Sequence, residues 1–323
     1  DSNNIGPRVG FAWQLDDSGR TVLRASSGVM YELPLGQNYE DALTNSGTTK
    51  FLTASLGPRD GGAPAFPGTL ASLPAGEIPA QPSIETVSPD YKAQYAILSN
   101  VQIEHALTDN VAVSAGYVNS TGRNLPIGVS VNYGLSGNTL PDGRPIYDRA
   151  VREFPQFNRI KEQRSEGRSQ YNAVTVQMNK RMSGGFQAQA SYTWASAKDH
   201  PLGGGFVVGG RDAEGLSDPT NPDRDYGFTT WNVKHTFIAS TVIRPHSANK
   251  VLDNNQLGII LQLNSGLPVE FRSNRDLNND GLSNDRPNNV ARNTVSMGRV
   301  FNLDARYSRF IPINDRMRAE LFV

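Results

Sequence analysis

Alternation of apolar and polar residues is the feature of this sequence that most constrains its fold. From Phe186 to Trp194 the even-numbered residues are Phe, Ala, Ala, Tyr and Trp, whereas the odd-numbered residues are Gln, Gln, Ser and Thr. Successive side chains of a strand point to opposite faces, so this segment predicts a strand with one apolar and one polar face. An apolar face that ends in aromatic rings, opposite a polar face, is typical of outer-membrane β-barrels.

The same alternation recurs along the chain in segments that are joined in pairs by short polar turns. The turn at 16–19 reads Asp-Asp-Ser-Gly and the turn at 183–185 reads Ser-Gly-Gly, and both suit tight hairpins. We predict about ten strands, which cover residues 8–15, 21–32, 91–107, 111–119, 171–182, 186–196, 235–244, 256–267, 300–310 and 317–323.

Long connections alternate with the short turns. They cover about 34–90, 120–168, 197–230 and 270–298. Transmembrane barrels have short periplasmic turns and long extracellular loops. The sequence therefore predicts an all-β fold, an antiparallel transmembrane β-barrel fragment of about ten strands. A soluble sandwich or propeller is the alternative, and the repeated apolar face with aromatic ends disfavours it.

Composition narrows the class of protein further. The 323 residues carry 31 Lys and Arg against 31 Asp and Glu, a balance that disfavours a nucleic-acid-binding function. The chain has no Cys, which removes disulfides and thiolate metal ligands. Together with the predicted barrel, this composition leads us to expect that the protein lies in the cell outer membrane, where membrane lipid is a partner, and that it does not bind nucleic acid.

Several segments resemble, in serial order, the barrel of TonB-dependent receptors. Asn4–Trp13 is similar to the "N-x-x-P-R-x-G-F-A" strand of that family, and Asn232–Phe237 is similar to its "D-V-R-H-R-F" segment. The stretches 169–173, 180–182 and 191–199 add to the resemblance. The most similar subgroup is the Oar-like one, whose members carry a carboxypeptidase-regulatory-like domain before the plug.

The resemblance implies a 22-stranded barrel with an N-terminal plug and import driven by the TonB complex. On this basis residues 1–323 form a single partial barrel domain that lacks the signal peptide, the plug and the terminal strands. The implied function is binding and import of an unidentified extracellular substrate, with the TonB complex engaged through the missing plug region. The alternative is an outer-membrane scaffold that displays adhesion or signalling loops without transport. An enzyme is not expected, because no catalytic constellation is visible.

One loop carries a motif that suits a metal ion. Residues 276–285 read Asp-Leu-Asn-Asn-Asp-Gly-Leu-Ser-Asn-Asp, which matches the start of a calcium loop, where oxygens at alternate positions converge on a hard cation. Position twelve, where such loops place a Glu, is Pro287. The alternative is an acidic, Asn-rich turn in a solvated loop. The predicted calcium ligands are Asp276, Asn278, Asp280, the carbonyl of Leu282, and Asp285.

The four histidines do not form a second metal site in the sequence. His105, His200, His235 and His246 are not spaced as metal ligands with one another. We expect them to be ordinary lumen or interface residues. Aromatic residues near the predicted strand ends are expected to form the girdles of the barrel at the membrane interfaces.

Overall fold

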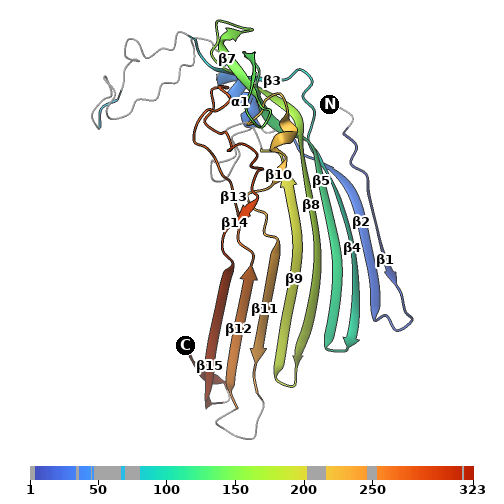
Figure 1. Cartoon of the computed structure of the whole chain (residues 1–323). Helices are drawn as coiled ribbons and strands as arrows, with labels where there is room; N and C mark the ends of the chain where they lie inside the picture. The colour runs from blue at the N-terminus through green and yellow to red at the C-terminus, as the bar shows by residue number, and fades with distance from the viewer. Residues whose placement is uncertain are drawn as a thin grey trace.

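The protein is an antiparallel sheet whose ten long strands follow one another in chain order (Figure 1). The computed structural model describes residues 4–33, 36–44, 46, 67–69, 81–201, 216–245, 253–314 and 316–323. The ten strands are β1 (Arg8–Gln14), β2 (Thr21–Tyr31), β4 (Tyr95–Thr108), β5 (Val111–Ser130), β8 (Ile160–Ser183), β9 (Phe186–Asp199), β11 (His235–Ile243), β12 (Asn255–Asn264), β15 (Val300–Asn314) and β16 (Met317–Phe322).

Shorter elements gather at one end of this sheet. Strand β3 pairs with β8 in parallel and β10 pairs with β9, while β6–β7 and β13–β14 form two separate hairpins (Figure 1). Among the described residues the sheet is open, with β1 and β16 as its edge strands. The short elements are α1 (Gly36–Thr44), β3 (Ile84–Val87), β6 (Tyr133–Thr139), β7 (Pro145–Arg152), the 3-10 helix η1 (Pro222–Asp225), β10 (Gly227–Phe228), β13 (Pro268–Val269) and β14 (Val295–Ser296).

The predicted fold class and the number of long strands are confirmed, but the predicted second loop is wrong in extent. Strand β5 continues to Ser130 and β8 already begins at Ile160, so only the middle of 120–168 is a connection. The charged stretch Lys161–Arg168, which falls within the predicted connection 120–168, lies in β8. Charged residues occupy both faces there: Lys161 pairs with Glu85 at 3.1 Å, and Glu162 of the other face pairs with Arg164 at 3.0 Å. This part of the strand therefore has no apolar face to detect.

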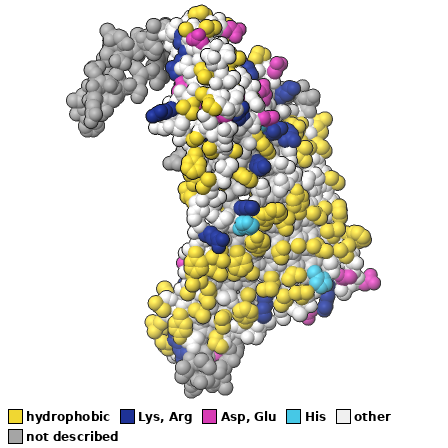
Figure 2. Space-filling model, viewed as in Figure 1, with side chains coloured by type: hydrophobic (Ala, Val, Ile, Leu, Met, Phe, Trp, Pro, Cys, Tyr) yellow, Lys and Arg dark blue, Asp and Glu magenta, His cyan; other side chains and the backbone are white. Residues whose placement is uncertain are grey.

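Cross-strand register places the alternating residues on two consistent faces. Val174 of β8 lies opposite Tyr117 of β5 and Trp194 of β9, whereas the adjacent residue Thr175 lies opposite Gly116 and Thr193. Residues directly opposite each other point to the same side of a sheet. One face is therefore apolar across the sheet, and its side chains form a broad band below the short elements (Figure 2).

The apolar face is not covered by other parts of the described chain. Val176 and Trp194 are each 50% exposed and Leu303 is 54% exposed. In water such a continuous surface would favour association, and in a barrel it faces lipid. None of the described helices has the length and apolar character needed to cross a membrane.

Candidate functional site in the loop layer

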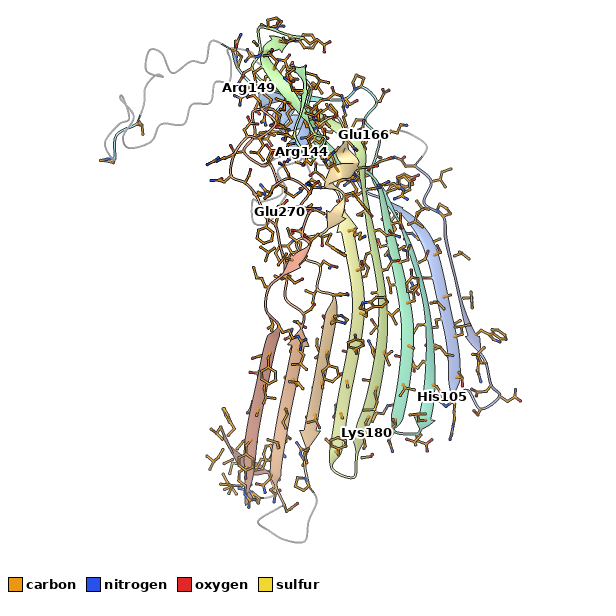
Figure 3. All side chains as sticks on the ribbon, viewed as in Figure 1. His105, Arg144, Arg149, Glu166, Lys180 and Glu270 are labelled. Carbon is orange, nitrogen blue, oxygen red and sulfur yellow. The ribbon has the colours of Figure 1, made fainter. Side chains whose placement is uncertain are left out.

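The long connections pack together into one layer at the end of the sheet opposite the short turns. We call residues 81–94, 124–165, 216–234 and 265–299 the loop layer. Figure 3 shows the division: Arg144, Arg149 and Glu166 lie at the loop end of the sheet, whereas His105 and Lys180 lie near the short turns. The loop layer is the part of the described chain in which residues from different connections meet.

A small apolar cluster anchors the loop layer to the sheet. Ile127 and Val129 on the extended end of β5 are buried against Leu216, and Val131 packs beside them. Leu216 begins the described part of the connection between β9 and β11. Continuation of β5 beyond the apolar band therefore supplies the surface on which another loop packs.

Asn132 fixes the chain where β5 ends. Its side-chain amide donates hydrogen bonds to the carbonyl oxygens of Phe154, Phe157 and Asn158 at 3.2, 3.0 and 2.9 Å. Its carbonyl oxygen accepts the backbone N–H of Phe154 at 2.9 Å. Asn132 is 1% exposed, so these bonds satisfy a buried amide that water does not reach.

Arg144 joins two connections that are far apart in the sequence. Its guanidinium contacts Asp142 at 3.0 Å and Asp285 at 2.5 Å, and it donates a further bond to the carbonyl of Arg286 at 2.9 Å. The side chains of Arg144 and Asp285 are 2% and 0% exposed. A buried charge is tolerated when opposite charges and hydrogen bonds surround it, and this pair meets both conditions.

Arg286 extends the network to a third connection. It forms ion pairs with Asp225 and, at 3.3 Å, with Glu270, and it donates a hydrogen bond to the hydroxyl of Ser217 at 3.1 Å. Asp225 in turn accepts the backbone N–H of Ser217 at 2.9 Å. Three of the long connections are thus held together by buried, mutually compensating charges.

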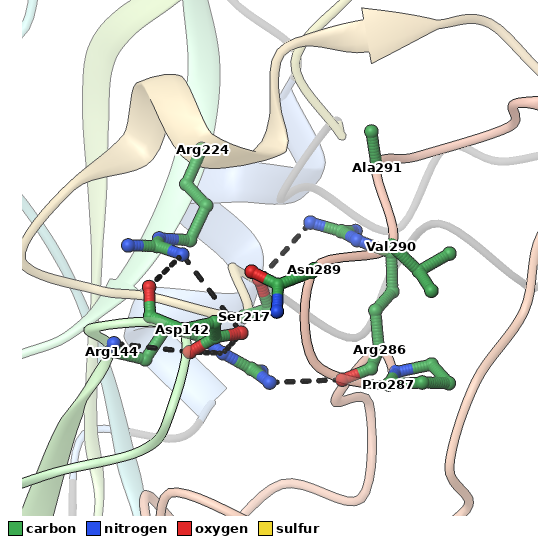
Figure 4. Close-up of a pocket in the computed structure, with 9 residues that line it drawn as sticks. All are labelled: Asp142, Arg144, Ser217, Arg224, Arg286, Pro287, Asn289, Val290 and Ala291. Carbon is green, nitrogen blue, oxygen red and sulfur yellow. Dashed lines mark hydrogen bonds and ion pairs between the residues drawn. The ribbon is translucent and has the colours of Figure 1, made fainter.

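A polar cleft of about 200 Å³ lies where these three connections meet (Figure 4). Arg144, Arg224 and Arg286 line it, and each has a carboxylate partner; for Arg224 the partner is Asp218 at 3.3 Å. Because these charges compensate one another, the cleft suits a polar ligand that binds through hydrogen bonds. The remaining lining residues are Asp142, Ser217, Pro287, Asn289, Val290 and Ala291.

The first half of the predicted calcium motif folds as a compact turn. The backbone N–H of Asp280 donates to Asp276 Oδ1 at 3.0 Å and to Asn278 Oδ1 at 3.1 Å. The N–H of Gly281 donates to Asp276 Oδ2 at 3.0 Å, and Gly281 has a φ of +93°. The sharp turn needs a residue that tolerates positive φ. It brings the side-chain oxygens of Asp276 and Asn278 together around the backbone N–H of Asp280.

Asp285 has a different role from the other predicted ligands. Its Oδ1 pairs with Arg144, and its Oδ2 accepts the backbone N–H of Leu277 at 2.5 Å. Asp276 also pairs with Arg149 at 2.6 Å. Within the described residues, no three His, Cys, Asp or Glu side chains are arranged to hold a metal ion. The turn therefore holds itself together through amides and arginines, and calcium binding stays a prediction.

Burial changes the acidity of two carboxyl groups in this turn. Asp280 is 1% exposed, and burial raises its pKa to about 7 despite hydrogen bonds from Leu282 and Asn278. Burial also raises the pKa of Asp285, while Arg144 acts in the opposite direction. Among the described residues no cation pairs with Asp280, so desolvation dominates at this position.

The histidines that the structure describes have local partners. His200 is 1% exposed; one ring nitrogen accepts the N–H of Arg168 at 3.1 Å and the other lies 3.2 Å from Asp223. His105 contacts the hydroxyl of Thr21 and His235 contacts that of Tyr192, both at 2.8 Å. His246 lies outside the described residues.

Sequence reasoning missed the residues that connect the loops. Arg144 and Asp285 are 141 positions apart, and Arg286 and Asp225 are 61 apart. No local spacing relates such residues, and Arg, Asp and Asn are common in solvated loops. Only the Asp-rich turn at 276–285 gave a local signal at this site, because its side chains bond to amides within the same turn.

The open antiparallel sheet, its apolar outer face and the one-sided loop layer define a protein of the outer-membrane β-barrel class. The chain matches the model of the family described as "Outer membrane beta barrel domain" over residues 1–311, and it belongs to that family. It is a protein of the outer membrane. No curated protein matches the chain.

Solved structures of outer-membrane transporters have a similar fold. The outer membrane transporter YddB from Escherichia coli aligns with a TM-score of 0.57 at 11% identity, over 95% of this chain and 34% of that chain. FpvA of P. aeruginosa, bound to heterologous pyoverdines, aligns with a TM-score of 0.51 at 13% identity, over 98% and 28%. The chain thus spans about a third of the length of these structures.

Proposed function

We propose that the chain is part of a TonB-dependent receptor that binds an extracellular substrate at its loop layer and passes it inward. The observation that carries the proposal is the asymmetry of the sheet. One end has short turns, and the other has a loop layer whose connections are interlocked around a polar cleft. Import needs such a binding surface on the outer side and a polar inner wall below it. The Oar-like subgroup and coupling to the TonB complex, through a plug outside this chain, belong to this proposal.

The polar inner wall has the composition that passage of a hydrated substrate requires. Small and amide residues lie opposite one another there, as in the row Gln102, Gly116, Thr175 and Thr193. The hydroxyls of Thr175 and Thr193 lie 3.0 Å apart. The neutral hydrogen-bonding groups of this row attract water without holding an ion strongly.

Ferric chelates are the first substrates to test. The FpvA structure is that of a pyoverdine–iron complex, and only the fold relates it to this chain. Of the three arginines that line the cleft, Arg224 is 31% exposed and offers hydrogen-bond donors to an oxygen-rich chelate. No enzymatic step is part of this proposal.

The experiment is uptake of radiolabelled substrate by cells that produce the complete protein, with and without a functional TonB complex. A panel of ferric chelates is offered, and a strain that lacks the protein is the control. Uptake that needs both the protein and TonB supports the proposal. A protein that binds chelates at the cell surface, with no uptake in either strain, supports the alternative of a surface scaffold for adhesion or signalling.

Calcium binding by the 276–285 turn is a separate proposal about the same layer. The converging oxygens of Asp276 and Asn278 and the positive φ of Gly281 support it. Extracellular calcium modules bind in the range of about 10⁻⁴–10⁻³ M. Calcium should protect the loop from protease in the wild-type complete protein, and Asp280→Ala should remove that protection. Equal cleavage of the wild-type protein with calcium and with a chelator would exclude the site.

A further inference from the structure

A group of cations lies on the lipid-facing side of the sheet, above its apolar band. Arg123 of β5 lies opposite Tyr95, and Lys198 of β9 lies opposite Gln170 of β8. Register therefore places both cations on the same face as Tyr95, Val174 and Trp194, which is the apolar face. Figure 2 shows Lys and Arg side chains above the hydrophobic band on this face.

Arg168 of β8 belongs to the same group. It follows the alternation of Gln170 and Val174 on β8, and its guanidinium lies 4.5 Å from the centre of the Tyr226 ring. Both Arg168 and Arg123 act electrostatically to lower the pKa of Tyr226, although burial has the larger effect and raises it. The Arg168 guanidinium thus lies over the Tyr226 ring on this side of the sheet.

The side chains between the aromatic residues and the cations change from apolar to polar. On β9 the outward residues after Trp194 are Ser196 and Lys198, and on β8 those preceding Val174 are Asn172 and Gln170. Lys198 lies two side-chain positions beyond Trp194, or about 13 Å along the strand. This sequence of apolar, aromatic, polar and cationic groups follows the change from hydrocarbon to headgroups in a membrane.

Charge balance differs between this group and the loop layer. Arg123 and Lys198 are exposed, and no carboxylate pairs with either among the described residues. Arg168 contacts Asp223 at 3.0 Å. Lys198 also lies 5.1 Å from the centre of the Phe228 ring. Within the described part of the chain, Asp223 is the one carboxylate paired with these three cations, and Asp199, which also acts on Tyr226, is paired with Arg292 at 2.5 Å.

We propose that Arg123, Arg168 and Lys198 form a binding site for the anionic phosphate headgroup of a lipid in the outer leaflet. Two observations favour this ligand: the three cations directly adjoin the lipid-facing apolar band, and positive charge exceeds negative charge among them. Guanidinium groups bind phosphate oxygens in a bidentate manner, and aromatic rings favour the headgroup region. Since the proposal concerns the outer wall of the barrel, it does not depend on import.

The experiment compares lipid binding by three forms of the complete protein in phosphatidylcholine nanodiscs that contain a minor fraction of phosphatidylglycerol. The first form is the wild type and the second is R123Q/K198Q. The third, R24Q/R306Q, removes two positive charges that register places on the polar face, where Arg24 lies opposite Gln102 and Arg306 lies opposite Gly258. Native mass spectrometry counts the phosphatidylglycerol that each form retains, and heat-modifiable gel mobility verifies that each form is folded.

The expected result is retention of phosphatidylglycerol by the wild type and by R24Q/R306Q, with a loss in R123Q/K198Q. Each charge near a membrane surface contributes about 1 kcal/mol, so the affinity should fall about fivefold for each cation removed. Equal retention by all three forms, or an equal loss in both variants, would overturn the proposal. Displacement of the lipid by millimolar inorganic phosphate would assign the site to a free anion and would also overturn it.

Discussion

The membrane-spanning sheet and the loop layer are built in opposite ways. In the sheet, large apolar side chains such as Trp194 and Leu303 are half-exposed and point outward. In the loop layer, charged side chains such as Arg144, Asp225 and Asp285 are almost completely buried. The difference follows from the surroundings. Lipid favours apolar side chains at the surface and disfavours backbone N–H and C=O groups that lack a hydrogen-bond partner, whereas loops in water need specific side-chain contacts to hold a single conformation.

Each region satisfies its polar groups by a different route. The sheet does so through the continuous backbone ladder between its strands, which needs no particular side chains. The loop layer has irregular backbone, and side chains such as Asn132 and Asp285 bind the amides and carbonyls that no strand pairs. Substitutions on the sheet should therefore act according to the face that they occupy, while substitutions in the loop layer should act according to the partner that they leave unpaired.

The largest effect is expected from Arg144→Met. It leaves the buried carboxylate of Asp285 without its cationic partner, and loss of one member of a buried pair costs about 3–5 kcal/mol. Hydrogen exchange measured by mass spectrometry should show that residues 276–286 open more readily, while heat-modifiable gel mobility shows an intact barrel.

Arg149→Ala is the matched control for this prediction. Arg149 pairs with Asp276 in the same turn, but its side chain is 44% exposed, so the loss should be within about 0–1 kcal/mol. If Arg144→Met and Arg149→Ala open the turn to the same small extent, the buried network does not hold the loop layer together.

The next effect is expected at the middle of β9. Ala190 lies opposite Met178 and Ala239 on the apolar face, so Ala190→Arg places a charge in lipid and should cost about 2–4 kcal/mol. Gln189 lies opposite Asn179 and Ser240 on the polar face, and Gln189→Arg should cost much less. Urea unfolding of the complete protein in vesicles measures both costs, and equal costs would contradict the assignment of the two faces.

The smallest effect is a dependence of the loop layer on pH. Burial raises the pKa of Asp280 to about 7 in the closed turn, whereas the opened turn has an ordinary carboxyl group. Between about pH 4 and pH 7 the opened turn therefore binds fewer protons than the closed one, and closure weakens as pH rises. In a calcium chelator, the protection of residues 276–286 from hydrogen exchange, taken relative to the intrinsic exchange rate at each pH, should fall over this range.

Asp280→Asn tests the origin of this pH dependence. The amide has nearly the shape of the neutral carboxyl group and cannot ionise, so the loss of protection between pH 4 and pH 7 should become smaller. A remaining dependence in the same direction is expected from Asp285, whose pKa burial also raises. An unchanged pH profile in Asp280→Asn would show that Asp280 does not cause the effect.

The sequence predicted the sheet well because a period of two repeats along every membrane-spanning strand. The even–odd pattern of 186–194 is the same pattern that register places on the two faces. The prediction of strand extent was wrong for β5 beyond Asn119 and for β8 before Tyr171. There the strands leave the apolar band, and the alternation of apolar and polar residues ends. For the loop layer, the sequence predicted only the length and the polarity of the connections. Its contacts join residues such as Arg144 and Asp285, which are far apart in the sequence and follow no local pattern.

The central claim is that side chains along one strand point alternately to the lipid and to the interior of the barrel. Single cysteines on β9 test this claim most directly. The chain has no native Cys, so Ala190→Cys and Gln189→Cys introduce one label site each. In the complete protein in vesicles, a charged maleimide should label Gln189→Cys and spare Ala190→Cys, while a lipid-soluble maleimide should show the reverse preference. Equal labelling of both positions by the charged reagent would contradict the claim.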